Sequence, residues 1–162
     1  MQGEKSGEVK LACFFLAGQS YAIDIMKIHQ IIRPTKIRPL PQSPDFVEGV
    51  INLRGAVVPI IDLRKRFEVE INPEQEPRVI IVSVDKQVVG IVVDDVTDVI
   101  TVTRQQIQPP PRLSGIPAQF LKGACQHGDD ILLILNLDEL LTSEEKISLA
   151  ELKSNARKGV EE

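Results

Sequence analysis

The sequence predicts a mainly β protein made of two similar halves, each folded into a small five-stranded barrel. Three features of its 162 residues support this prediction. Short runs rich in valine and isoleucine recur along the chain with turn signals between them, and such side chains favour strands. Segments of the first half reappear in the second. Aromatic residues make up only 4% of the chain, so the core must rest on aliphatic side chains.

The internal repeat is clearest where each half begins its last pair of strands. The segment FVEG at 46–49 is answered by FLKG at 120–123, which is 120 − 46 = 74 residues later. At the same offset, IIDL at 60–63 is answered by ILNL at 134–137. Earlier segments match at an offset of 68, for example Ile31-Ile32 with Val99-Ile100. The six-residue difference predicts a longer loop in the second half.

The first elements of each half read as hairpins. Residues 1–8 are polar and predict a mobile tail. Apolar runs at 11–16 and 21–25 are joined by a turn at Gly18-Gln19, which indicates the first hairpin. The second half repeats this arrangement with runs at 79–84 and 88–93.

Each hairpin is followed by one further strand, a proline-rich connector and a final strand pair. The extra strands are expected at 28–32 and 96–100. Eight of the 11 prolines lie in the two connectors, and proline cannot donate to a central ladder, so the connectors are loops or edges. Gly49 and Gly123 then open the last strand pairs, whose second strands are 57–61 and 131–135.

These elements give each half about five strands, which remove their exposed edges best by closing into a barrel. The folded domain is expected over residues 9–152, with the first barrel at about 9–77 and the second at about 78–141, although strands could be exchanged between them. Thr142-Ser143-Glu144-Glu145 fits a capping box and predicts a short C-terminal helix from about 143, with a frayed tail at 153–162. A shorter helix is predicted at Leu63 to Phe67.

Composition excludes several functional classes. The net charge of −4 and the isoelectric point of about 5.3 argue against nucleic-acid binding. Cys13 and Cys125 are too few for a disulfide framework and are interpreted as buried thiols. The N-terminus has no apolar signal segment, and no apolar run approaches the ~18 residues of a membrane span. A cytoplasmic protein without direct membrane insertion is therefore predicted.

No cluster of residues indicates catalysis. His29 and His127 lie far apart in sequence, and neither belongs to a metal-binding pair. The acidic segment at 94–98 lacks the glycine and final glutamate of a calcium loop and is interpreted as a solvated strand end. The basic residues at 64–66 are interpreted as a solvated face. We therefore predict no catalytic residue, no metal site and no cofactor.

One turn breaks the repeat. Asn52-Leu53-Arg54-Gly55 stands where the second half has Gln126-His127-Gly128-Asp129. Arg54 offers five donors in a fixed fork, Asn52 can brace a turn, and Gly55 allows a positive φ. Two interpretations stay open: a plain hairpin with an exposed arginine, or a recognition site at the seam of the barrels that accepts an amphipathic helix.

The segment from Phe46 to Leu63, FVEGVINLRGAVVPIIDL, closely resembles the signature of the CheW family of bacterial chemotaxis coupling proteins. VGIVVDDV at 89–96 is similar to a second block of that family, and GDDILLILN at 128–136 with Leu140-Leu141 resembles its final strand and helix start. The resemblance covers roughly residues 9–152.

The resemblance implies two SH3-like barrels with a hydrophobic junction, in a non-catalytic adaptor. Family members join the cytoplasmic tips of methyl-accepting chemoreceptors to the histidine kinase CheA, whose regulatory domain is itself CheW-like and pairs with them into rings. The implied receptor groove uses the arginine matching Arg54 and the strand matching 28–32. The kinase contact is implied on the first barrel and a second ring contact on the other, without assigned side chains.

One position departs from the family, which commonly has glutamate where this chain has Gln30. Neutral Gln30 cannot form a charged pair with Arg54 or with a receptor arginine, which points to a different receptor class or a sister, non-flagellar pathway. The expected receptor-binding groove comprises Ile28, Gln30, Ile31, Asn52, Leu53, Arg54 and Gly55.

Three alternatives remain. A CheV-type adaptor would carry a receiver domain, which is absent up to Glu162. A small-ligand enzyme or sensor would use a cavity between the barrels. A structural array filler would bind other CheW-like barrels and no receptor.

Overall fold

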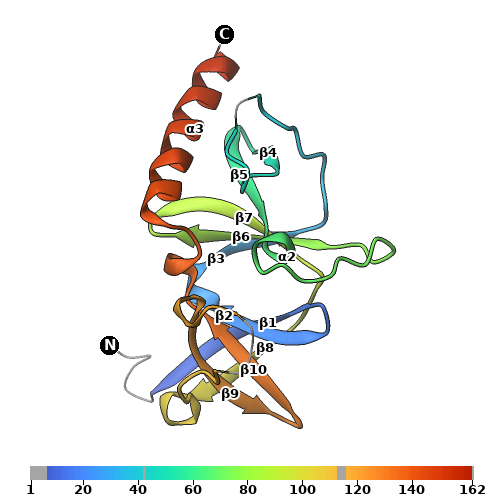
Figure 1. The fold of residues 1–162 in the computed structure, drawn as a ribbon, viewed down its shortest axis with the longest axis vertical. Coiled ribbons are helices and arrows are strands. Elements are labelled where there is room, and N and C mark those ends of the chain that lie inside the picture. The colour runs from blue at the N-terminus through green and yellow to red at the C-terminus, as the bar shows by residue number, and fades with distance from the viewer. Residues whose placement is uncertain (1–6, 42, 113–115, 162) are drawn as a thin grey trace.

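The computed structural model describes residues 7–41, 43–112 and 116–161, with side chains as far as residue 153 (Figure 1). Its strands form two five-stranded sheets. Sheet A has the order β8-β1-β2-β10-β9, and sheet B has the order β3-β6-β7-β5-β4. The strands of sheet A are β1 (Glu8–Leu16), β2 (Gln19–Asp24), β8 (Asp95–Thr103), β9 (Leu121–His127) and β10 (Asp130–Leu135). Those of sheet B are β3 (Ile28–Ile32), β4 (Gly49–Leu53), β5 (Ala56–Asp62), β6 (Arg78–Val84) and β7 (Gln87–Val93).

Both predicted hairpins are present, but each belongs to a sheet completed by the other half of the chain. Hairpin β1–β2 pairs with β8 and β10, whereas hairpin β6–β7 pairs with β3 and β5. The two sheets follow one pattern, including a parallel pairing of β10 with β2 and of β5 with β7. The boundary expected near residue 77 therefore does not separate the sheets, because the strands are exchanged reciprocally.

Each sheet closes into a barrel because one of its proline-rich connectors pairs with an edge strand. The connector after β3 pairs with β4 in sheet B, and the connector after β8 pairs with β9 in sheet A. Arg38 and Val50 exchange backbone hydrogen bonds of 2.9 Å, and Gln108 and Ala124 do the same at 2.7 and 2.8 Å. A Cβ on Gly49 would lie 2.5 Å from the Arg38 carbonyl oxygen, so only glycine permits this approach. The closure confirms the predicted pair of small barrels.

The hydrophobic core has three parts. One aliphatic cluster fills the interior of sheet A and another fills sheet B. The largest cluster lies between the two sheets. Four of the six aromatic side chains stack through it, with ring centroids 5.5–5.9 Å apart: Phe14, Tyr21, Phe67 and Phe120. The junction between the barrels is thus a packed core, and burial there raises the pKa of Tyr21 to about 12.

Short helices lie between the strands, and of these only η1 links one sheet to the other: η1 (Ile25–Lys27), α2 (Leu63–Arg66), η2 (Arg104–Gln106), η3 (Ala118–Phe120) and η4 (Leu137–Glu139). The helix α2 matches the one predicted after Ile61-Asp62. No helix of the described residues is long and apolar enough to cross a membrane.

The C-terminal helix α3 (Ser143–Glu161) is longer than expected. Thr142 and Glu145 form the predicted capping box, with hydrogen bonds of 2.9 and 3.1 Å. The helix continues to Glu161 and so includes most of the segment at 153–162 that was predicted as a frayed tail. Its first turns are held on the protein by the buried Leu149 and by a bidentate ion pair from Arg66 to Glu145 at 2.6 and 2.8 Å.

Candidate functional site

The Asn-Leu-Arg-Gly segment forms a tight two-residue turn between β4 and β5. Leu53 pairs with Ala56, so Arg54 and Gly55 are the turn residues. Both have positive φ, at 55° and 88°, which suits the twist of a hairpin of this length. The Asn52 side-chain oxygen accepts a 2.8 Å hydrogen bond from the Gly55 amide. The bracing role predicted for Asn52 is therefore present.

The turn brings Arg54 to the opposite edge of sheet B. The Arg54 Nη2 donates a hydrogen bond to the Oε1 of Gln30, on strand β3. The two residues are 24 positions apart, and β3 and β4 are the two edge strands of the sheet. Gln30 thus orients an exposed guanidinium without neutralising it. Where a glutamate would form an ion pair with Arg54, this chain has a neutral acceptor.

The seven residues of the predicted groove do not all lie together on the surface. Gln30, Arg54, Asn52 and Gly55 are linked by the hydrogen bonds described above. Ile31 follows on β3 with 43% of its surface exposed. By contrast, Leu53 packs against the core of sheet B, and Ile28 packs against the cluster between the sheets. The accessible part of the predicted site is consequently the Arg54 fork held by Gln30, whereas Ile31 lies on the other face of β3, because it pairs with Ile80 and Gln30 pairs with Ile81.

A buried group of three charges lies where the sequence predicted two solvated segments. Arg64 forms two 3.0 Å hydrogen bonds to the carboxylate of Asp62 and one of 3.3 Å to Asp94. All three residues are 5–7% exposed. The hydrogen bonds to Asp62 raise the pKa of the Arg64 guanidinium; burial opposes this rise, and Asp94 adds to it.

This buried group joins elements that are distant in sequence. Asp62 ends β5 and caps α2 by accepting from the Arg64 amide at 2.9 Å. Asp94 follows β7, and its second oxygen accepts a 2.8 Å hydrogen bond from the amide of Ala17, in the β1–β2 turn. The solvated interpretation is therefore wrong for Arg64 and Asp94, whereas Lys65 is exposed as expected. The signal available in the sequence was the capping aspartate directly before α2.

The cysteines and the potential metal ligands do not form a reactive or metal-binding group among the described residues. Both cysteines are buried; burial is the main cause that raises the pKa of Cys13 to about 12 and that of Cys125 above its ordinary value. Neither thiol is therefore activated as a nucleophile. Among the described residues, no group of three or more histidine, cysteine, aspartate or glutamate side chains is placed to hold a metal ion.

Comparison with known proteins agrees with this architecture. Residues 10–145 match the family described as the CheW-like domain. The chain is 37% identical over 147 residues to the chemotaxis protein CheW of Klebsiella aerogenes, covering 90% of this chain and 88% of that protein. It is 34% identical over 151 residues to the chemotaxis protein CheW of Treponema pallidum, covering 90% and 89% of the two chains.

A solved structure is also similar. The scaffolding protein TtCheW from Thermoanaerobacter tengcongensis superposes with a TM-score of 0.76 at 36% identity, covering 83% of this chain and 88% of that one. The shared sequence pattern, the two exchanged sheets and this superposition lead to one conclusion. The chain belongs to the CheW family of chemotaxis scaffold proteins.

Proposed function

We propose that this protein is a cytoplasmic coupling protein that joins chemoreceptor tips to the regulatory domain of the histidine kinase CheA. The observation that carries the proposal is the exposed Arg54 fork, which Gln30 holds between the two edge strands of sheet B. A guanidinium fixed in this way can bind a carbonyl or carboxylate of a partner helix. A chemoreceptor tip, as a helical hairpin, would supply such a group.

The geometry of Arg54 favours recognition over a structural role. The hydrogen bond to Gln30 engages one of its terminal nitrogens, and a guanidinium carries five donor hydrogens. Among the described residues Arg54 makes no other side-chain hydrogen bond or ion pair, and the residues of its turn are exposed. Because Gln30 restricts the side chain before a partner arrives, less conformational entropy is lost on binding.

The two barrels form one body through which a bound receptor can influence a bound kinase. The packed junction and the buried Arg64 group connect both sheets. A partner on either barrel therefore contacts the same rigid unit. In this proposal, a change in receptor packing alters the populations of kinase states because both proteins bind that unit.

The charge of Arg54 provides the direct test. Arg54→Glu should leave the stability nearly unchanged but weaken binding of a soluble receptor-tip fragment by ~1–3 kcal/mol, as expected for loss of a charged hydrogen bond. Lys86→Glu is a matched control, because Lys86 is also exposed and also has a positive φ, 71°, in the β6–β7 turn. Equal receptor affinity of the wild type and Arg54→Glu by calorimetry would contradict the groove assignment.

The neutral side chain of Gln30 should influence which receptor tips the protein prefers. Gln30→Glu would convert the hydrogen bond to Arg54 into an exposed ion pair, with an effect on stability of less than about 1 kcal/mol. We expect this variant to gain affinity for receptor tips that present an arginine to this position. A parallel titration of tip fragments with and without that arginine measures the change in preference.

A structural array filler is the second candidate function, and the observation in its favour is that the neutral Gln30 cannot form a charged pair with a receptor arginine. Pull-down with the isolated kinase regulatory domain and, separately, with a receptor-tip fragment distinguishes the two. Binding to both supports coupling. Binding to the kinase domain alone, across receptor tips of several classes, supports the filler.

A further inference from the structure

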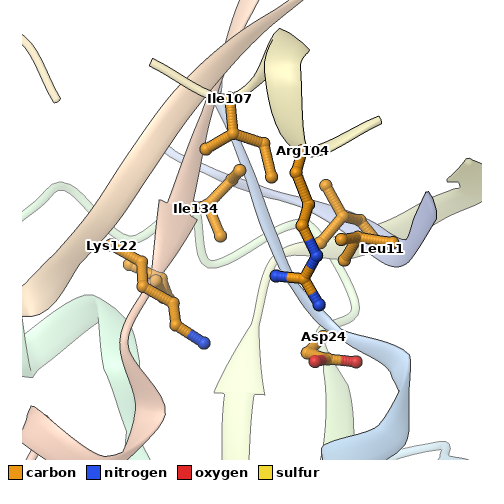
Figure 2. A pocket seen from close by; sticks show the side chains of 8 residues that line it. Leu11, Asp24, Arg104, Ile107, Lys122 and Ile134 are labelled. Carbon is orange, nitrogen blue, oxygen red and sulfur yellow. The ribbon is translucent and has the colours of Figure 1, made fainter. Parts of the chain in front are cut away.

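A pocket of about 280 Å³ lies on barrel A, the barrel formed by sheet A (Figure 2). The Arg54 turn belongs to barrel B, which is formed by sheet B. Its lining combines aliphatic side chains with three charged ones: Val9, Leu11, Asp24, Arg104, Ile107, Lys122, Ile134 and Leu135. In Figure 2 the charged ends of Arg104, Lys122 and Asp24 lie below the side chains of Ile107 and Ile134. The pocket therefore has an apolar side and a charged side.

The apolar side is built by the barrel itself. Leu11 and Ile134 are 1% and 4% exposed and belong to the core of sheet A. Ile107 covers this core because Gly123 leaves room for it: a Cβ at position 123 would lie 2.7 Å from the Cγ2 of Ile107. The aliphatic surface is consequently fixed before any ligand arrives.

A β-bulge supplies the lysine. In the pairing of β9 with β10, Gly123 lies opposite Ile134 and Leu121 lies opposite Leu135, so Lys122 is the extra residue. Bulges re-aim side chains and are common beside binding sites. Lys122 forms no ion pair with the described residues.

The opposite charge comes from the end of β2. The Oδ1 of Asp24 accepts a 2.9 Å hydrogen bond from the Met26 amide, as the N-cap of η1. The structure gives Oδ2 no hydrogen bond or ion pair among the described residues. Two cationic groups and one carboxylate therefore share a small pocket.

Because the chain contains an internal repeat, the lining residues of this pocket can be compared with their counterparts in the other barrel. In barrel B the aliphatic positions are kept, since Ile37 and Ile60 are the counterparts of Ile107 and Ile134. Two charged positions are not kept: barrel B has Glu48 and Val92 where barrel A has Lys122 and Asp24. Glu48 forms an ion pair of 2.8 Å with Lys65. The charges of Lys122 and Asp24 are therefore not needed to build a barrel of this kind.

We propose that this pocket binds a free aliphatic α-amino acid in its zwitterionic form. The branched side chain would lie on Ile107 and Ile134, the carboxylate would face Lys122 and Arg104, and the ammonium group would face the free oxygen of Asp24. Such a ligand satisfies charges of both signs and matches a pocket too small for a larger cofactor. This effector site goes beyond the proposed coupling function, which does not depend on it.

Three ligands test the charge pattern: leucine, its deaminated acid 4-methylpentanoate, and its decarboxylated amine 3-methylbutylamine. We expect leucine to bind the full-length protein by calorimetry and to raise its melting temperature. Each single-charge analogue should bind at least about tenfold more weakly, because one side of the pocket is then left unpaired.

Two variants locate the site. Lys122→Met removes the cation from the bulge, and Asp24→Asn removes the anion while keeping an oxygen that can cap η1. Each should weaken leucine binding at least about tenfold, whereas Glu48→Gln at the counterpart position should not. Circular dichroism of each variant verifies that it is folded.

The proposal is overturned if leucine and other aliphatic amino acids give neither heat nor a melting shift at about 10 mM, a concentration that detects even millimolar affinity. It is equally overturned if the two charge variants bind leucine as the wild type does. Receptor-tip binding is measured separately on the same samples, so failure here leaves the coupling function standing.

Discussion

Replacing Arg64 by methionine should destabilise this protein more than any other single charge removal. Methionine keeps a long side chain and removes only the guanidinium. In the wild type, that group makes two hydrogen bonds to Asp62 and one to Asp94, and all three residues are almost fully buried. The substitution leaves two carboxylates close together in the interior without a cation.

The expected loss is large because the partners stay buried. Removing one member of a buried ion pair costs about 3–5 kcal/mol, since the remaining charge is desolvated and unpaired. For a domain of this size, 1 kcal/mol corresponds to about 2–4 °C, so the melting temperature should fall by roughly 6–20 °C. Asp94 also accepts from the Ala17 amide, so the loss extends to the β1–β2 turn of the other sheet.

Urea and thermal unfolding followed by far-UV circular dichroism measure this change, because the chain has no tryptophan. Lys65→Met is the matched control. Lys65 is adjacent, but its side chain is 57% exposed in its pair with Glu48, so its loss should cost less than about 1 kcal/mol. Adding Asp94→Asn to Arg64→Met should recover part of the stability. If Arg64→Met unfolds within 1 kcal/mol of the Lys65 control, the buried group does not stabilise the junction as argued here.

Three further outcomes are expected. Burial favours the neutral form of Glu145, but hydrogen bonds and charge from Arg66 outweigh this effect and lower its pKa. The stability that these interactions contribute is therefore complete above the ordinary pKa of 4.5. It disappears as the pH falls through the lowered pKa. Glu145→Gln should therefore destabilise by about 1–2 kcal/mol at pH 7, and its unfolding free energy should converge with that of the wild type once the pH has fallen below the lowered pKa of Glu145. Gly49→Ala should cost about 2–4 kcal/mol by urea titration, because its φ is 152° and the new Cβ would meet the Arg38 carbonyl, whereas Gly128→Ala, in open space, should cost about 1–2. Both thiols should resist a disulfide reagent at pH 8 until urea unfolds the chain, and rapid labelling of Cys13 in the native protein would contradict its burial.

The strands could be predicted from the sequence because their signals are local. Strand β3 (Ile28–Ile32) and both hairpins lie where the apolar runs place them. Their partners could not be predicted in the same way. An apolar run such as residues 28–32 fits the edge of either barrel, and the repeat makes the two barrels nearly equivalent. The pairing of β3 with β6, for example of Ile31 with Ile80, shows which sheet it joins, and β4, β5 and α2 lie between these partners in the sequence.

The candidate site likewise has a part that could be predicted from local sequence signals and a part that could not. The turn at Arg54 and the brace from Asn52 follow from residues within four positions of one another. The link to Gln30 depends on how the edges of the sheet approach, and the sequence holds no local signal for it. Arg64 was misassigned because a basic run normally indicates a solvated face. Its burial depends on Asp94, which is 30 residues away.

The reciprocal exchange of strands bears directly on how such a scaffold can transmit a signal. Neither half of the sequence contains a complete sheet, because β1 and β2 require β8, β9 and β10, and β6 and β7 require β3, β4 and β5. Separating the barrels would therefore break ladders within both sheets as well as the aromatic core between them. In the coupling function proposed above, a partner bound at the Arg54 turn would not open the junction for the free energy of a few surface contacts. That proposal therefore implies that information passes through the position and orientation of one rigid body, with the moving parts in its partners.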